Sequence, residues 1–198
     1  MVDYLAKQLM LSSSSPRRAE LLKQIGLDFS VSHPEVDETP IRGEAPDIYV
    51  ARLALSKAKV GWTDGFISLG ADTIVVHEGK LLGKPTNADE GIWMLRSLSA
   101  QTHQVMTGVA VYDGVRNESV VVTSQVSFRS ITPAEAQAYW QSGEPHDKAG
   151  GYAIQGLGAI FCDKIEGSYT AIVGLPVFET ENLLRSFDID TWTMRANV

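Results

Sequence analysis

Near its start, the chain has two adjacent arginines that follow a run of serines and one proline. In the run Ser12–Arg18, Pro16 suits the first position of a helix, so Arg17 and Arg18 fall in the first helical turn. Two cations there face the positive end of the helix dipole, an unfavourable placement that a bound anion would reverse. We therefore predict a phosphate site, for which the candidate ligands are Ser13, Ser15 and Arg18. The alternative is a polar surface turn with solvated arginines.

An acidic residue also stands inside an apolar segment. Asp72 lies between Ala71 and Thr73 in the run Gly70–Val75. A carboxylate among apolar residues is costly to bury unless it is paired, hydrogen-bonded or bound to a metal. At a strand end it could hold Mg²⁺ or Mn²⁺, or take a proton from water. The alternative is a carboxylate that caps a neighbouring helix or accepts loop amides.

Further charged residues suit the same chemistry. Asp37 and Glu38 could bind a divalent ion that bridges phosphates, and Lys57 and Lys84 could neutralise phosphate charge. Taken singly, each fits an ordinary solvated residue better. They can act together only if the fold brings them to one place, which their spacing in the sequence does not establish.

A glycine-rich segment lies later in the chain. Asp147–Gly158 has four glycines among its twelve residues, a composition typical of a loop that wraps a ligand or approaches another backbone closely. Within it, Gln155 can donate and accept hydrogen bonds at once, which suits the edge of a nucleobase. A tight structural connection is the competing interpretation.

Composition limits the class of protein. The formal net charge of -7 and the pI of about 5.1 argue against broad binding to nucleic acid or to anionic membranes. No apolar stretch is long enough to span a bilayer, and the N-terminus lacks the pattern of a secretory signal. The only cysteine, Cys162, excludes an intrachain disulfide. We therefore expect a cytoplasmic protein.

The elements that would position these residues alternate irregularly between strand and helix. Apolar periodicity, caps and breakers predict strands at 9–11, 29–32, 66–76 (interrupted or ended at Asp72), 80–82, 104–112 and 119–129, a hairpin at 159–164 and 168–173, and helices at 16–25, 46–60, after Asn87, from Pro133 to near Gly143, and from Pro176 to 187. Ser15 is expected to cap the first helix. No repeat or linker separates independent domains, so we predict a single domain over 1–198.

These segments, in this order, resemble the Maf family of nucleotide pyrophosphatases. The likeness runs from about Leu9 to Phe187 and is specific as a combination. It is carried by Ser13–Arg18, Arg52–Ala54, Lys57–Ala58, Gly70–Thr73, Gly83–Pro85, Leu98–His103, Asp147–Gly150, Gly156–Gly158 and Val173–Pro176.

The resemblance implies an α/β fold with a strongly twisted mixed sheet flanked by helices, in two lobes with a central cleft. It implies hydrolysis between the α- and β-phosphates of a nucleoside triphosphate, with a divalent cation (Mg²⁺, Mn²⁺ or Co²⁺), and suggests a homodimer. Asp72 matches the catalytic base. Glu38, Lys57 and Lys84 match positions for metal and phosphate, so the implied metal ligands are Glu38 and Asp72.

Three positions sort substrates within that family, and here they are Arg17, Thr73 and Gln155. This set is similar to the branch acting on dTTP and UTP, with modified pyrimidine nucleotides as further candidates. One alternative is the same chemistry on 7-methyl-GTP or another non-standard nucleotide. Another is a nucleotide-sensing inhibitor of septum formation, which would bind nucleotide without releasing pyrophosphate.

Overall fold

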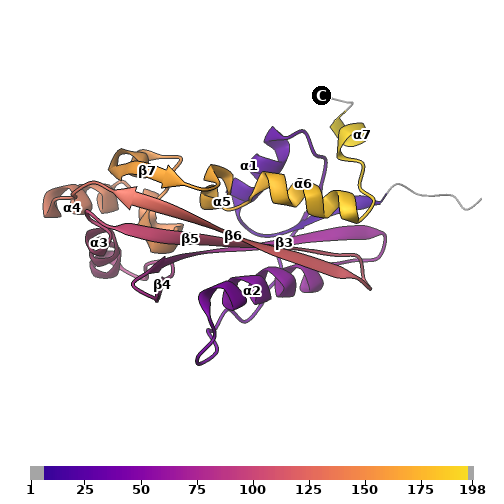
Figure 1. Ribbon diagram of the computed structural model, residues 1–198, viewed down its shortest axis with the longest axis horizontal. Helices are drawn as coiled ribbons and strands as arrows, with labels where there is room; N and C mark the ends of the chain where they lie inside the picture. The colour runs from indigo at the N-terminus through magenta and orange to yellow at the C-terminus, as the bar shows by residue number, and fades with distance from the viewer. Residues whose placement is uncertain (1–6, 196–198) are drawn as a thin grey trace, which may run out of the picture. The chain divides into compact units, whose positions relative to one another are not determined.

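The computed structural model describes residues 7–195 and is built around a mixed seven-stranded sheet with helices packed against it (Figure 1). The strands follow the order β2-β1-β3-β5-β6-β7, and β4 pairs with β3 outside that path. Their bounds are β1 (Gln8–Ser12), β2 (Ser30–Ser32), β3 (Phe66–His77), β4 (Lys80–Leu82), β5 (Thr102–Tyr112), β6 (Asn117–Phe128) and β7 (Cys162–Glu166).

Seven α-helices are present in the described part of the chain, and most begin at a proline or a capping side chain. Their bounds are α1 (Pro16–Gln24), α2 (Pro46–Val60), α3 (Ala88–Ser97), α4 (Pro133–Gln141), α5 (Tyr169–Val173), α6 (Val177–Ser186) and α7 (Thr191–Arg195). Three short 3-10 segments lie at Glu144–Asp147, Ala149–Gly151 and Leu157–Phe161. Of these helices, none is long and apolar enough to cross a membrane.

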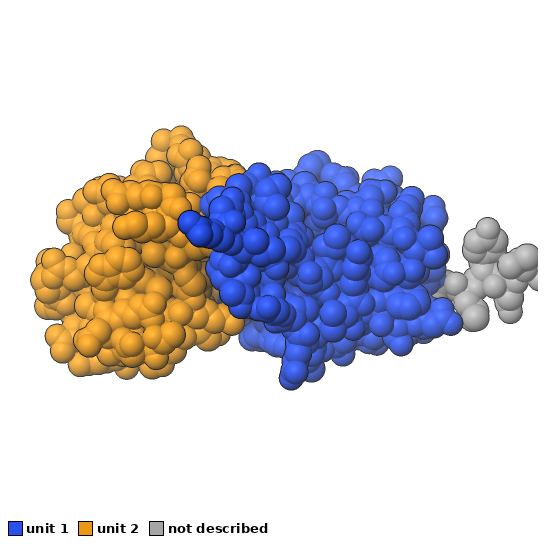
Figure 2. Space-filling model, turned by 90° about the horizontal axis from the view of Figure 1, so that it is seen from below, with its two compact units in different colours: residues 1–72, 107–121, 174–198 blue, residues 73–106, 122–173 orange. Residues whose placement is uncertain are grey.

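The chain folds into two compact units, coloured separately in Figure 2. Unit 1 contains residues up to Asp72, then Thr107–Val121, and the chain from Gly174 onward. Unit 2 contains Thr73–Met106 and Val122–Val173.

In unit 1, β1 runs parallel to both β2 and β3. Figure 1 shows α2 on one face of the sheet, with α1 and α6 on the other. The helix α2 approaches β3 closely because Gly70 has no side chain: a Cβ there would lie 2.2 Å from the carbonyl oxygen of Ala54. Ser12, fully buried, bonds the hydroxyls of Ser32 and Ser68 at 3.0 and 2.7 Å, which ties the three strands together. Ser12 is therefore a structural member of the serine run.

In unit 2, the core is formed by buried side chains of α3, α4, β5 and β6, joined by residues of β3, β4 and α5 and by packed aromatic rings. The strands β4 and β7 run antiparallel to β3 and β6 respectively. Gly91 on α3 lets Trp140 of α4 pack directly on the helix backbone, since a Cβ would lie 2.2 Å from the indole ring.

Several expected elements are confirmed. The helix predicted at 46–60 has those bounds, and α4 has a complete capping box between Thr132 and Glu135. Asn87 caps α3 as expected, accepting the N–H of Glu90 at 2.9 Å. The mixed α/β fold agrees with the expected class.

Other expectations are wrong. β3 continues for twelve residues through Asp72 instead of breaking there, because the carboxylate is paired and the backbone need not leave the sheet. The second strand of the hairpin at 168–173 is the helix α5, which Ser168 caps by accepting the N–H of Ala171 at 3.2 Å. Ser15 occupies the N-cap position of α1, but its side chain makes no capping hydrogen bond.

Candidate active site

In unit 1, a lysine joins two of the predicted carboxylates. Lys57 Nζ on α2 lies 2.6 Å from Asp72 Oδ1 on β3 and 2.6 Å from Glu38 Oε1 in the loop at 33–44. The side chains of Lys57 and Asp72 are only 12% and 11% exposed, whereas that of Glu38 is 54% exposed. The centre is thus buried on the Asp72 side and open at Glu38. Of the four charged residues that spacing could not bring together, Glu38 and Lys57 meet here, beside Asp72. Asp37 instead accepts the N–H of Thr39 at 2.9 Å within its own loop.

The loop that carries Glu38 is fastened to α2 by two side chains. The Tyr49 hydroxyl donates to the Glu38 carbonyl oxygen at 2.8 Å. Arg52 forms a two-pronged ion pair with Glu44, its Nε and Nη2 lying 2.6 and 2.8 Å from the carboxylate oxygens. Burial raises the pKa of Tyr49, and the negative charges of Asp72 and Glu38 raise it further, so the phenol stays a donor.

The buried side chain of Arg18 holds the turn at Ser12–Arg18 in shape. Arg18 is 8% exposed; its Nε donates to the carbonyl oxygen of Gly174 and its Nη1 to Ser13 Oγ, both at 2.9 Å. Ser13 Oγ also accepts the N–H of Ser15 at 3.2 Å. Burial lowers the pKa of the Arg18 guanidinium, and the nearby charge of Asp72 acts in the opposite direction. The two predicted phosphate ligands Ser13 and Arg18 therefore also shape the turn itself.

The start of α1 keeps the features expected of an anion site. The Ser15 side chain makes no capping hydrogen bond to the helix, and the first turn of the helix contains no acidic residue. Backbone N–H groups at such an end attract anions. Arg17 on this turn is half-buried, and Ser14 Oγ lies 3.2 Å from Nδ1 of His33 in the adjacent loop.

The remaining predicted residues belong to unit 2. Thr73 follows Asp72 in β3 and is half-buried, whereas Lys84 and Gln155 are exposed. Next to Lys84, the carbonyl oxygen of Gly83 accepts the N–H of Gly150 at 3.0 Å. This bond joins the segment of Lys84 to the glycine-rich segment.

Two residues that sequence reasoning missed organise the turn around Gln155. The Glu144 carboxylate accepts the N–H groups of Leu157 and Gly158, each at 2.9 Å. The Tyr139 hydroxyl donates to that carboxylate at 2.7 Å. Their only sequence signal is the pair of glycines at 156 and 158, which indicates close approach without naming the partner.

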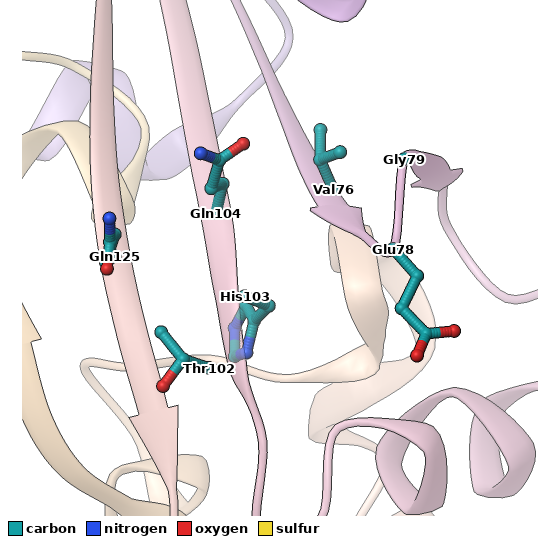
Figure 3. Close-up of a pocket in the computed structure, with 7 residues that line it drawn as sticks. All are labelled: Val76, Glu78, Gly79, Thr102, His103, Gln104 and Gln125. Carbon is teal, nitrogen blue, oxygen red and sulfur yellow. The ribbon is translucent and has the colours of Figure 1, made fainter.

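Unit 2 also has a shallow pocket of about 250 Å³ that contains none of the predicted site residues (Figure 3). Gln104 of β5 and Gln125 of β6 line it from neighbouring strands, and Glu78 lies in the β3–β4 turn. His103, which also lines the pocket, is 2% exposed, and its Nε2 lies 2.8 Å from the Tyr152 hydroxyl. Burial, reinforced by the charge of His77, lowers the pKa of His103 to about 3. His103 is therefore a neutral core residue.

Two carboxylates of unit 1, those of Glu38 and Asp72, are close enough to suit a divalent cation. Among residues 7–195, no group of three or more His, Cys, Asp or Glu side chains forms a metal cage. Glu38 and Asp72 nevertheless bring one oxygen each to the same cation, the ammonium of Lys57. Mg²⁺ is commonly held by one or two carboxylates plus phosphate and water, so two converging carboxylates suit it.

Comparison with known proteins agrees with the mixed α/β fold. Residues 8–187 match the family described as Maf-like protein, and the chain belongs to that family.

Within it, the chain is similar to proteins named dTTP/UTP pyrophosphatase. It is 50% identical to that of Pseudoalteromonas atlantica over 89% of this chain and 95% of the relative. It is 50% identical to that of Saccharophagus degradans over 93% and 90%, and 48% identical to that of Vibrio parahaemolyticus over 90% and 96%.

Proposed function

We propose that the protein is a pyrophosphatase that hydrolyses dTTP and UTP between the α- and β-phosphates, giving the nucleoside monophosphate and pyrophosphate. The observation that carries the proposal is the Lys57 bridge between Asp72 and Glu38. It lies in a chain half identical to proteins named for that reaction. The substrate assignment rests on those relatives and on Arg17, Thr73 and Gln155.

In this mechanism Asp72 is the general base. Its carboxylate orients a water molecule toward the α-phosphorus and accepts a proton as the water oxygen bonds to phosphorus and the bond to the bridging oxygen of pyrophosphate breaks. Lys57, held between two carboxylates, fixes the orientation of Asp72 and offers its charge to the phosphates. Because Asp72 is nearly buried, its charge is weakly screened by water.

A divalent cation, when bound, supplies positive charge to the phosphate oxygens. We assign its protein ligands to Glu38 and Asp72, with Mg²⁺, Mn²⁺ or Co²⁺ as candidates. Glu38 is the exposed partner of Lys57, so its carboxylate would be accessible to the cation while the Asp72 side of the centre stays buried.

Phosphate and base are recognised by different residues in this proposal. The groups assigned to phosphate are Ser13, Ser15, Arg18 and Lys84. Arg17, Thr73 and Gln155 are assigned to the nucleoside. The amide of Gln155 can donate to O4 and accept from N3–H of uracil or thymine. Cytosine has the opposite pattern, with an amino donor at C4 and an acceptor at N3. The same edge pattern in UTP and dTTP explains how one side chain serves both.

We extend the proposal to a homodimer in the cytoplasm that binds neither nucleic acid nor membrane. The acidic balance of the chain and the family membership support it. Light scattering on the purified protein tests the dimer: a mass near twice the 21.6 kDa of the chain is expected, and a single-chain mass contradicts it.

A substrate panel tests the reaction. We expect purified protein with Mg²⁺ or Mn²⁺ to release pyrophosphate from dTTP and UTP in clear preference to CTP, ITP and 7-methyl-GTP. Preference for 7-methyl-GTP would assign the chain to a different substrate branch. Tight binding of dTTP without release of pyrophosphate would instead support a nucleotide sensor.

A further inference from the structure

The turn that presents Gln155 is held by side chains on both sides of that residue. Two residues after Gln155, the N–H of Leu157 donates to Glu144 Oε2 at 2.9 Å, and the N–H of Gly158 donates to Glu144 Oε1 at 2.9 Å. Two residues before it, the N–H of Ala153 donates to the Tyr139 hydroxyl at 3.0 Å. The turn closes on itself through the N–H of Gly156, which donates to the Ala153 carbonyl oxygen at 3.2 Å.

The two holding side chains are themselves bonded to each other. The Tyr139 hydroxyl donates to Glu144 Oε1 at 2.7 Å. Tyr139 is 5% exposed, and its ring packs edge-on against Phe161 with centroids 5.2 Å apart. We call Tyr139 and Glu144 the clamp. The clamp is therefore anchored in the core of unit 2, whereas Gln155 at the tip of the turn is exposed.

Two glycines make the close approach possible. A Cβ on Gly156 would lie 2.1 Å from Glu144 Oε2. A Cβ on Gly158 would lie 2.6 Å from the Tyr139 hydroxyl and 2.8 Å from the Ala153 carbonyl oxygen. Contacts this short exclude any larger residue at either position unless the clamp opens. The Gly156-Leu157-Gly158 sequence is thus explained by the clamp.

The surroundings of Glu144 and Tyr139 favour the protonation states that these hydrogen bonds require. Burial acts to raise the pKa of Glu144, but the bonds from Tyr139, Gly158 and Leu157 outweigh it and lower that pKa overall. Burial, together with the bond to Glu144, raises the pKa of Tyr139. At neutral pH the carboxylate is an acceptor and the phenol a donor.

We propose that Tyr139 and Glu144 are positioning residues for base selection: they fix the backbone on both sides of Gln155 so that its amide is preorganised for the pyrimidine edge. This inference rests on the proposed function, because that function assigns the base contact to Gln155. A fixed backbone reduces the entropy lost when the amide binds and discriminates more sharply between bases.

Two variants and two matched controls test the clamp. Tyr139→Phe removes the hydroxyl and keeps the ring, and Glu144→Gln replaces one carboxylate oxygen by an NH₂ group facing an N–H donor. Tyr169→Phe and Glu166→Gln make the same chemical changes at exposed sites of unit 2, where Glu166 pairs only with the exposed Lys164 among the ion pairs of the described residues.

The first measurement is amide hydrogen exchange, which does not depend on activity. We expect the amides of Ala153, Leu157 and Gly158 to exchange about tenfold faster in the two clamp variants, the effect of losing one ordinary hydrogen bond. Exchange elsewhere in unit 2 and in the controls should remain unchanged. Unchanged exchange at these three amides, or equal acceleration throughout the unit, would overturn the clamp.

The second measurement is the ratio of kcat/KM for dTTP to that for dCTP. We expect each clamp variant to reduce this ratio about tenfold, mainly through KM for dTTP, and we expect the same effect from Gln155→Ala. In the double variant of Glu144→Gln and Gln155→Ala, the clamp substitution should cause little additional loss, since both changes act through one contact.

The two proposals fail in different ways. If the unmodified protein releases no pyrophosphate from dTTP or UTP, the proposed function is wrong and so is the role in base selection, while exchange still shows whether the clamp exists. If the unmodified protein is active and selective but the clamp variants lose rate equally on dTTP and dCTP, the positioning role alone is wrong. Tyr139→Phe, which preserves the core ring, decides the matter if Glu144→Gln does not fold.

Discussion

The buried histidine of unit 2 makes acid stability a quantitative test of the fold. His103 Nδ1 is buried and has no hydrogen-bond partner in the described part of the chain. Protonation would place an N–H on that nitrogen without an acceptor, and folding therefore favours the neutral ring. Its pKa falls to about 3 in the folded protein from the usual 6.5. Because the folded pKa is lowered, the stabilisation is fully present above pH 6.5 and is lost as the pH falls toward 3.

The size of the effect follows from these two pKa values. Between about pH 7.5 and about pH 4.5 the unfolded chain binds a proton at this histidine and the folded protein does not, which lowers the free energy of unfolding by roughly 2–3 kcal/mol. His103→Gln removes the titrating group but keeps a polar side chain near the Tyr152 hydroxyl. The variant should be less stable than the unmodified protein at neutral pH, and this difference should shrink by about that amount at pH 4.5.

Urea unfolding at several pH values, followed by tryptophan fluorescence, measures the difference. His146→Gln makes the same substitution at an exposed position and serves as the control. If the stability difference between His103→Gln and the unmodified protein stays constant from pH 7.5 to 4.5, the neutral buried histidine is refuted.

Two further substitutions test the packing that positions the site. Gly70→Ala should destabilise the protein by about 1–3 kcal/mol in urea unfolding, since its Cβ would lie 2.2 Å from the Ala54 carbonyl oxygen; Gly83→Ala, with nothing within 4 Å of its Cβ, is the control and should cost far less. Equal effects of the two would contradict the close approach of α2 to β3. Thr132→Ala should cost about 1 kcal/mol, because it removes the side chain that caps α4, whereas Thr132→Ser should restore most of the loss.

Elements that begin and end at strong local signals were predictable from sequence. The helix α2 begins at Pro46 and ends before Gly61, and the capping box of α4 is complete within four residues. Such signals act within one turn of helix, so they do not depend on distant parts of the chain.

The continuity of β3 was not predictable, because the partner that makes it possible is remote. A carboxylate is costly to bury inside an apolar strand unless it is paired, and Asp72 in β3 is paired with Lys57 from α2. The helix α5 was missed for a related reason. Thr170, Ile172 and Val173 favour a strand by their branched side chains, but the cap at Ser168 prevails.

The candidate site, too, was predictable from the sequence only in part. The residue types of Asp72, Glu38 and Lys57 suggested acid–base and phosphate chemistry, but their grouping around one ammonium depends on three separate elements. Apart from the glycines at 156 and 158, the clamp of Tyr139 and Glu144 left no signature in the sequence, since both residues act through backbone groups of a turn thirteen or fourteen positions away.

The most direct test of the proposed function is pyrophosphate release from dTTP by Asp72→Asn, with Asp28→Asn at an exposed position as control. Binding of a non-hydrolysable dUTP analogue and thermal unfolding would confirm that the Asp72 variant is folded and still binds nucleotide. The account predicts a loss of kcat of at least about a hundredfold with binding retained, since a general base contributes that much or more. Turnover close to that of the unmodified protein would contradict the assignment of Asp72 as the base.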